Sequence, residues 1–287
     1  MIVGRGFSWL RGIGLTALVL LVAVPLYAMA LTAFVPARDV QRAFRWIPRH
    51  VTLEAFDGMW SSVPLADYFR NSLLVALITT VLAIVIAVPA AYALTRFAFL
   101  GRRLLAGTLL ATQAVSGLLF LVPLVLLFGK ADQWFGIHLL GSYTGLVLTS
   151  MTFALPVSVG LLSTYFAGLP PQMEESAQDL GAGPLTTLWL VVLPNARSAI
   201  ATTAVFAFTL SWGEVLFASM LSDDDTRTLA VGLSGYASES GAHWNELMAA
   251  SLLAAAPVVV LFLVVSRSLR TGLGGRPAGG DTGLNDR

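Results

Sequence analysis

Residues 72–94 read SLLVALITTVLAIVIAVPAAYAL, an apolar stretch without a single charged side chain. This stretch exceeds the about 20 residues that an α-helix needs to cross roughly 30 Å of hydrocarbon. Working outward from it, we find five more apolar stretches of similar length: Ile13–Val35, Leu105–Phe128, Tyr143–Phe166, Ala199–Leu221 and Leu247–Val265. The sequence therefore predicts an all-α polytopic membrane protein with six transmembrane helices.

The composition supports a lipid environment and excludes several kinds of function. Of the 287 residues, 56% are hydrophobic and 11% are charged, whereas soluble domains carry about 25% charged residues. The net charge of +1 offers no strongly basic face to nucleic acid, and the absence of cysteine excludes disulfides and thiolate chemistry. The three histidines lie far apart in the sequence without the spacing of metal ligands. We expect neither a metal nor a cofactor.

The charge distribution predicts the orientation. An even number of spans places both termini on the same side of the membrane. Arg96, Arg102 and Arg103 lie in the short connection after the second span, and arginine and lysine favour the cytoplasmic side. The segment Pro36–Arg70 also contains several arginines and argues for the opposite orientation. We give the short connection more weight and expect cytoplasmic termini, with residues 1–12 preceding the first span.

The two ends of the chain flank a membrane domain that we place at residues 13–270. Arg5 and Arg11 precede the first span as they would in a signal peptide. Its apolar run is longer than that of a cleaved signal, so we expect an uncleaved anchor. Thr271–Arg287 is rich in glycine and polar residues and has no apolar periodicity. We expect this segment to be a disordered cytoplasmic tail.

The connection between the fourth and fifth spans, residues 167–195, has the pattern of helix, turn and helix. Pro170 and Pro171 suit the first turn of a helix, where a missing N–H costs nothing. Gly181 can end that helix in a left-handed conformation. A second helix is expected from Pro184 to Leu193. The two helices would project into the cytoplasm.

This connection resembles the signature loop of permease subunits in binding-protein-dependent ABC importers. That loop has a Glu-Ala-Ala core, a glycine after three further residues, and later an aliphatic-x-Leu-Pro sequence. Here Glu175-Ser176-Ala177 and Gly181 match, followed by Val191-Val192-Leu193-Pro194. Ser176 replaces the usual alanine with another small residue. Further similarities extend over most of the chain and indicate the maltose-type carbohydrate permease family: Phe69–Ala76, Ala90–Phe97, Trp212-Gly213-Glu214, Thr228-Leu229 and Trp244.

The resemblance implies that the first helix of this loop docks in a cleft of a separate ATPase. Negative residues near the start of a helix also suit its dipole. Because short motifs match by chance, the alternative is an ordinary amphipathic helix. The residues expected to make the ATPase-docking surface are Glu174, Glu175, Ser176, Ala177, Asp179 and Gly181.

The energy source must lie on another chain if transport is ATP-driven. A P-loop needs a Gly-Lys-Ser/Thr sequence that surrounds phosphates. The one lysine, Lys130, is followed by alanine. We therefore expect no enzyme activity of this chain itself. The resemblance implies assembly in a bacterial inner membrane with a second permease subunit, as a heterodimer, two ATPase subunits and an extracytoplasmic binding protein.

Glu214 is the one charged residue within the six predicted spans. An intramembrane charge is costly and often functional, so Glu214 and the neighbouring Trp212 are candidates for the translocation pathway. The alternative is that Glu214 supports packing near the outer end of its span. We expect the transported solute to be a sugar or a related polar molecule. Two alternatives are a non-sugar solute and an ion-coupled carrier, although a carrier usually needs more intramembrane charges.

Overall fold

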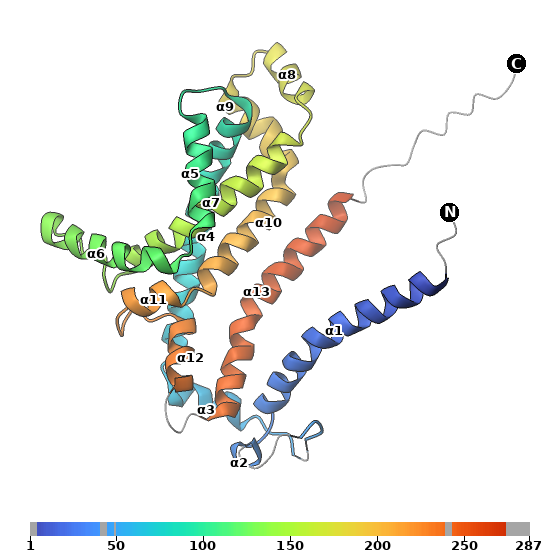
Figure 1. The fold of residues 1–287 in the computed structure, drawn as a ribbon, viewed down its shortest axis with the longest axis vertical. Coiled ribbons are helices and arrows are strands. Elements are labelled where there is room, and N and C mark those ends of the chain that lie inside the picture. Colours follow the sequence, from blue (N-terminus) through green and yellow to red (C-terminus); the bar gives the residue numbers. More distant parts are fainter. Residues whose placement is uncertain (1–4, 41–44, 49, 239–242, 274–287) are drawn as a thin grey trace, which may run out of the picture. The chain divides into compact units, whose positions relative to one another are not determined.

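The computed structural model describes residues 5–40, 45–48, 50–238 and 243–273 (Figure 1). Within these residues all regular structure is helical. The helices are α1 (Arg5–Ala33), α2 (Ala37–Val40), α3 (Glu54–Ser62), α4 (Leu65–Arg96), α5 (Arg102–Ala114), α6 (Leu118–Phe135), α7 (Tyr143–Ala167), α8 (Gln172–Asp179), α9 (Pro184–Thr187), the π-helical turn η1 (Leu188–Val192), α10 (Leu193–Trp212), α11 (Leu216–Leu221), α12 (Leu229–Ser238) and α13 (Trp244–Leu273).

Six helical segments in the described part of the chain are long and apolar enough to cross a membrane. This confirms the predicted all-α architecture with six spans. The segments are Arg11–Ala33, Leu65–Arg96, Leu118–Phe135, Tyr143–Ala167, Pro184–Trp212 and Trp244–Arg267.

The third span differs from the predicted helix over residues 105–128. The helix α5 ends at Ala114, Val115 adopts an extended conformation, and α6 begins at Leu118. A Cβ atom added to Gly117 would lie 3.4 Å from the ring of Phe153, so glycine allows the chain to turn close to α7. The apolar run continues through this break, which is why hydrophobicity alone predicted one helix across it.

The fifth span also differs from the predicted helix over residues 199–221. It begins much earlier, because α9, η1 and α10 form one continuous helical segment from Pro184. It ends at Trp212, and a separate short helix, α11, begins at Leu216. Glu214 therefore lies in the break between two helices. The break coincides with Gly213, which lacks the side chain that favours helix continuation.

The C-terminal helix extends further than expected. The sequence predicted a disordered tail from residue 271, but α13 continues to Leu273. The rest of that predicted tail, residues 274–287, lies outside the described residues, as do the first four residues of the predicted N-terminal segment.

The chain divides into two compact units. One comprises the described residues up to Asn71 together with those of Arg227–Ala256, and the other comprises Ser72–Thr226 together with the described residues from Pro257. In the first unit, Tyr27 stacks on Trp46 with ring centroids 6.4 Å apart. Tyr68 packs so closely on Gly232 that an added Cβ there would lie 2.2 Å from Tyr68 Cδ2.

The same unit contains a polar cluster around Glu246, near the start of α13. Its carboxylate accepts hydrogen bonds from the hydroxyls of Ser62 and Tyr236, and its Oε1 lies 3.0 Å from Nδ1 of His243. A Cβ added to Gly58 would lie 2.8 Å from Oε1 of Glu246. These contacts fix the start of α13 against α3 and α12.

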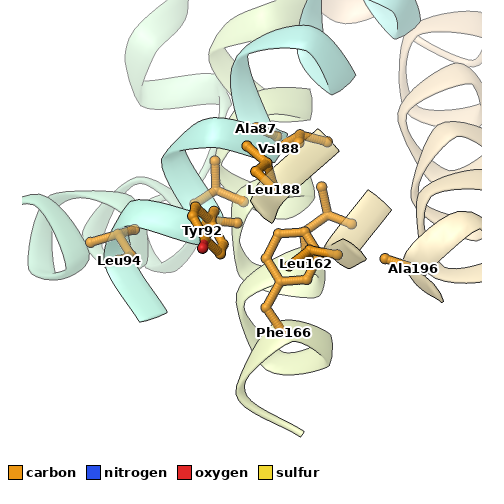
Figure 2. Packing of buried hydrophobic residues seen from close by; sticks show 11 residues of the cluster. Ala87, Val88, Tyr92, Leu94, Leu162, Phe166, Leu188 and Ala196 are labelled. Carbon is orange, nitrogen blue, oxygen red and sulfur yellow. The ribbon is translucent and has the colours of Figure 1, made fainter. Parts of the chain in front are cut away.

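The second unit is built around a core between α4, α7, η1 and α10 (Figure 2). Leu162 and Phe166 of α7 are fully buried there, beside Tyr92 of α4 and Leu188 of η1. Elsewhere in this unit one alanine from each of α4, α7 and α10 meets the others: Ala83, Ala154 and Ala207. Small residues allow membrane helices to approach closely. The core lies at the α8 end of α7, where it can support the connection between α7 and α10.

A tight turn before α7 predicts a strong effect of one glycine. A Cβ added to Gly145 would lie 2.0 Å from the backbone oxygen of Leu139, and a backbone atom cannot rotate away as a side chain can. We expect Gly145→Ala to lower the free energy of unfolding by about 1–3 kcal/mol, as overpacking does. Thermal unfolding in detergent measures this.

Gly160 provides the matched control within the same helix. An added Cβ there meets nothing within 4 Å, so Gly160→Ala should be neutral or stabilising by up to about 1 kcal/mol. Equal melting temperatures for the two variants would contradict the proposed clash.

Candidate functional site

The connection between α7 and α10 forms the helix, turn and helix that its sequence predicts. The backbone N–H groups of Met173 and Glu174 donate to the carbonyls of Pro170 and Pro171, which opens α8. The helix ends at Asp179, and Gly181 follows with φ of +86°. This left-handed conformation disfavours residues with a Cβ, and it confirms the predicted glycine turn. Figure 1 shows α8 and α9 beyond the ends of α7 and α10.

Glu174 points into the protein. Its side chain is 7% exposed, and its Oε1 accepts a hydrogen bond of 2.8 Å from Nε of Arg96. The hydroxyl of Tyr92 donates to Oε2 at 3.0 Å. Both partners lie in the last turns of α4. The carboxylate therefore attaches α8 to the end of a membrane helix.

Arg96 extends this attachment to α7. Its Nη2 donates to the carbonyls of Phe166 and Leu169, at 3.0 and 3.1 Å. The last carbonyls of a helix lack partners within the helix, and a cation there also suits the helix dipole. Tyr92 contacts the ring of Phe166 edge to face, with centroids 6.4 Å apart. We call Glu174, Arg96 and Tyr92 the α8 clamp.

The other residues predicted to dock an ATPase have a different environment from Glu174. All are exposed or half-buried: Glu175, Ser176, Ala177, Asp179 and Gly181. Two leucines beside them are also exposed, Leu180 to 89% and Leu185 to 71%. Small side chains, two carboxylates and accessible apolar groups together make a face on which another protein can pack.

The second arm of the connection is anchored in the core. Thr187 and Leu188 are buried, and the helix then widens into the π-turn η1. There the N–H of Leu193 donates to the carbonyl of Leu188, five residues earlier. Pro194 has no N–H, and its ring crowds the carbonyl four residues before it. A wider turn relieves this crowding, so the helix predicted to end at Leu193 continues into α10.

Glu214 begins α11. Its two carboxylate oxygens accept hydrogen bonds of 2.8 Å from the N–H groups of Phe217 and Ala218. Those N–H groups lie at a helix start, where they have no partner within the helix. Trp212 is buried and stacks on Phe208, with centroids 5.4 Å apart. The two pathway candidates thus lie on either side of Gly213, and each has a contact within this chain.

The acidic run after α11 forms a local turn. Asp223 accepts hydrogen bonds from the N–H and the hydroxyl of Thr226, at 3.0 and 2.7 Å. These bonds stabilise the charged carboxylate and lower the pKa of Asp223. Among the residues that the structure describes, no three His, Asp or Glu side chains gather as a metal site would require.

Arg96 and Tyr92 belong to the site but were not predicted as members of it. From the sequence, Arg96 was used only as a charge that indicates orientation, and Tyr92 only as part of a stretch similar to the permease family. A basic residue at the end of one span and a second glutamate beside the signature motif were the available signals.

Comparison with known proteins agrees with this geometry. The family described as "Binding-protein-dependent transport system inner membrane component" matches residues 80–273. An inner membrane ABC transporter permease protein of Escherichia coli, YcjP, is 32% identical, covering 91% of this chain and 92% of that protein. The diacetylchitobiose uptake permease NgcG of Streptomyces coelicolor is 31% identical, covering 87% and 82%.

A solved structure has the same fold. It is titled as a bacterial ABC transporter involved in the import of the acidic polysaccharide alginate. The matched chain superposes with a TM-score of 0.78 at 19% identity, covering 92% of this chain and 96% of that one.

Six apolar helices and an anchored helix-turn-helix connection define a multi-pass membrane protein with the fold of that solved transporter chain. The chain belongs to the family of binding-protein-dependent transport system inner membrane components. It is therefore a permease subunit of an ABC transport system in a bacterial inner membrane, a transport component and not itself an enzyme.

Proposed function

We propose that this chain forms half of the translocation pathway of an ATP-driven importer for sugars or related polar solutes. The family match carries the importer part of this proposal. The solutes of similar proteins support the solute class: NgcG is a diacetylchitobiose uptake permease, and the solved transporter is involved in the import of alginate. Both are carbohydrates.

The exposed face of α8 is the proposed docking surface for the ATPase. Glu175 and Asp179 offer carboxylates to basic or amide groups, and Leu180 offers an apolar contact. Ser176 and Ala177 are small enough to let a cleft close around the helix. Glu174 belongs to the same motif, but we assign it to the attachment of α8 because its carboxylate already has two partners.

The complete importer would contain a second permease subunit, two ATPase subunits and an extracytoplasmic binding protein. Both termini of this chain would be cytoplasmic, as the arginines near Arg96 indicate. The membrane helices α1 and α6 bury almost none of their span within this chain. Their side chains would therefore contact lipid or the second permease subunit. The resemblance to maltose-type permeases favours a heterodimer.

The break between α10 and α11 is the proposed contribution of this chain to the pathway. Irregular backbone within a membrane is tolerated where it is buried in protein or lines a water-filled cavity. Transporters place such breaks at their binding sites. Glu214 stabilises this break, and Trp212 flanks it with an aromatic surface. We place both residues next to the pathway.

Uptake of labelled sugars tests the proposed solute class. Cells that express this permease with its partner subunits are compared with cells lacking this chain, using labelled diacetylchitobiose, an α-glucoside and an alginate oligosaccharide. We expect at least one sugar to accumulate only when the chain is present. Accumulation of a labelled amino acid or another non-sugar solute instead would overturn the sugar assignment and leave the family membership intact.

A further inference from the structure

The helix α8 is joined to the rest of the protein by two short turns. The turn before it contains Pro170 and Pro171, and the turn after it contains Gly181, whose φ is +86°. A short helix held only by two turns could pivot when another protein pushes on it. The bending would then be absorbed in the turns.

The α8 clamp provides a third attachment, through side chains. Arg96 Nε and the Tyr92 hydroxyl bind the two oxygens of Glu174 from the end of α4. Nη2 of the same arginine binds the carbonyls of Phe166 and Leu169 at the end of α7. One guanidinium therefore joins three segments: α4, α7 and α8.

The clamp rests on the core of its unit. Tyr92 and Phe166 are both buried members of the cluster that also contains Leu188 of η1 (Figure 2). Displacement of Glu174 would have to break charge-assisted hydrogen bonds in a partly dehydrated site, where they are stronger than in water. A push on α8 is therefore passed to the helix ends before the turns can bend.

We propose that Glu174, Arg96 and Tyr92 are positioning residues that make α8 and the ends of α4 and α7 move as one body. This inference rests on the proposed coupling function and adds the path by which movement of the ATPase reaches the membrane helices. Docking and transmission are then separate properties of one short helix. Its exposed face binds the ATPase, and its buried glutamate transmits the movement.

The test separates the two properties with Glu174→Gln and, as a graded variant, Tyr92→Phe. Each is assembled with the partner permease and ATPase in lipid nanodiscs. Three quantities are measured: ATPase recovered with the chain, ATP hydrolysis, and the change in hydrogen exchange of residues 213–221 when Mg-ATP and vanadate are added. The last quantity reports whether the membrane part responds to nucleotide, and it requires no knowledge of the solute.

We expect Glu174→Gln to retain the ATPase and its hydrolysis. Its nucleotide-dependent change in hydrogen exchange should be about tenfold smaller than that of the wild type, an ordinary size for coupling between two sites. The change in Tyr92→Phe should lie between those of the wild type and Glu174→Gln. If Glu174→Gln responds to nucleotide as the wild type does, the clamp does not transmit movement. If the wild type itself recovers no ATPase, the proposed coupling function fails instead.

A reversible cross-link distinguishes transmission from a general loss of structure. This chain contains no cysteine, so Arg96→Cys with Glu174→Cys introduces the only two thiols of this chain. Replacing both charged partners also avoids leaving one buried charge alone. The two cysteines of the double variant are joined by a short bis-methanethiosulfonate, which forms a disulfide with each thiol, releases methanesulfinate and is cleaved by a reductant. Glu174→Cys alone receives the same reagent as the control, because Arg96→Cys alone would leave the carboxylate of Glu174 buried without its cation.

The cross-linked double variant should regain the nucleotide-dependent change in hydrogen exchange and lose it again when the reagent is cleaved. While cross-linked, it should show a larger change than the single variant treated with the same reagent. A double variant that responds as well before cross-linking as after it would overturn the proposal. The proposal would also be overturned if the cross-linked double variant bound the ATPase but showed no larger nucleotide-dependent change in hydrogen exchange than the same variant without the cross-link.

Discussion

Glu175→Arg and Gly181→Pro should each abolish recovery of the ATPase with this permease, while both variants still insert into the membrane. Glu175 lies on the exposed face of α8, so arginine reverses the charge presented to the partner. Gly181 has φ of +86°, and its N–H donates to the carbonyl of Gln178. Proline fixes φ near −65° and has no N–H, so the turn that presents α8 cannot form.

Co-purification in mild detergent measures this, with the amount of inserted chain determined for each variant. Gly183→Ala is the control from the same connection. Gly183 has an ordinary φ of −71°, and an added Cβ meets nothing within 4 Å. We expect it to recover the ATPase as the wild type does. Recovery by Glu175→Arg and Gly181→Pro at the same level would mean that α8 is not the docking helix.

Arg96→Met should be the most destabilising of the single substitutions considered for this chain. The variant leaves the carboxylate of Glu174 buried beside Tyr92 without its cation, and it removes the donor to the carbonyls of Phe166 and Leu169. Removing one partner of a buried ion pair costs about 3–5 kcal/mol. Thermal unfolding in detergent and the yield of inserted protein measure the loss.

Two further variants make this prediction specific. Arg103→Met changes an exposed arginine on the neighbouring helix α5, and a surface change of this kind stays within about 0.5 kcal/mol. Combining Arg96→Met with Glu174→Leu should recover much of the lost stability, because neither charge is then buried alone. A double variant as unstable as Arg96→Met would show that the ion pair is not the source of the loss.

The spans were predictable because crossing lipid requires long and mostly apolar runs, and Ser72–Leu94, for example, contains no charged side chain. The helix breaks were not predictable from apolarity. Gly117 and Gly213 lie inside runs that continue on both sides. Whether a glycine breaks a helix depends on contacts such as Phe153 beside Gly117 and on the capping of α11 by Glu214. These contacts join residues distant in sequence or depend on a turn that is already formed.

The two glutamates of α8 show the same limit within the site. Glu174 and Glu175 are identical in type and adjacent in sequence, so the motif assigned both to docking. Their difference comes from the rotation of α8 relative to α4, which turns one carboxylate toward Arg96 and the other toward solvent. That rotation is set by the packing of the whole connection on the core, and a local pattern does not contain it.

The energy source of uptake tests the central claim most directly. Uptake is measured in cells with whichever of the three labelled sugars named above accumulates only when this chain is present. A protonophore collapses the ion gradients while the cellular ATP level is maintained and measured. We predict that uptake persists under these conditions and stops when ATP is depleted with the gradients intact. Uptake that collapses with the gradients while ATP stays high would contradict the account and would identify an ion-coupled carrier.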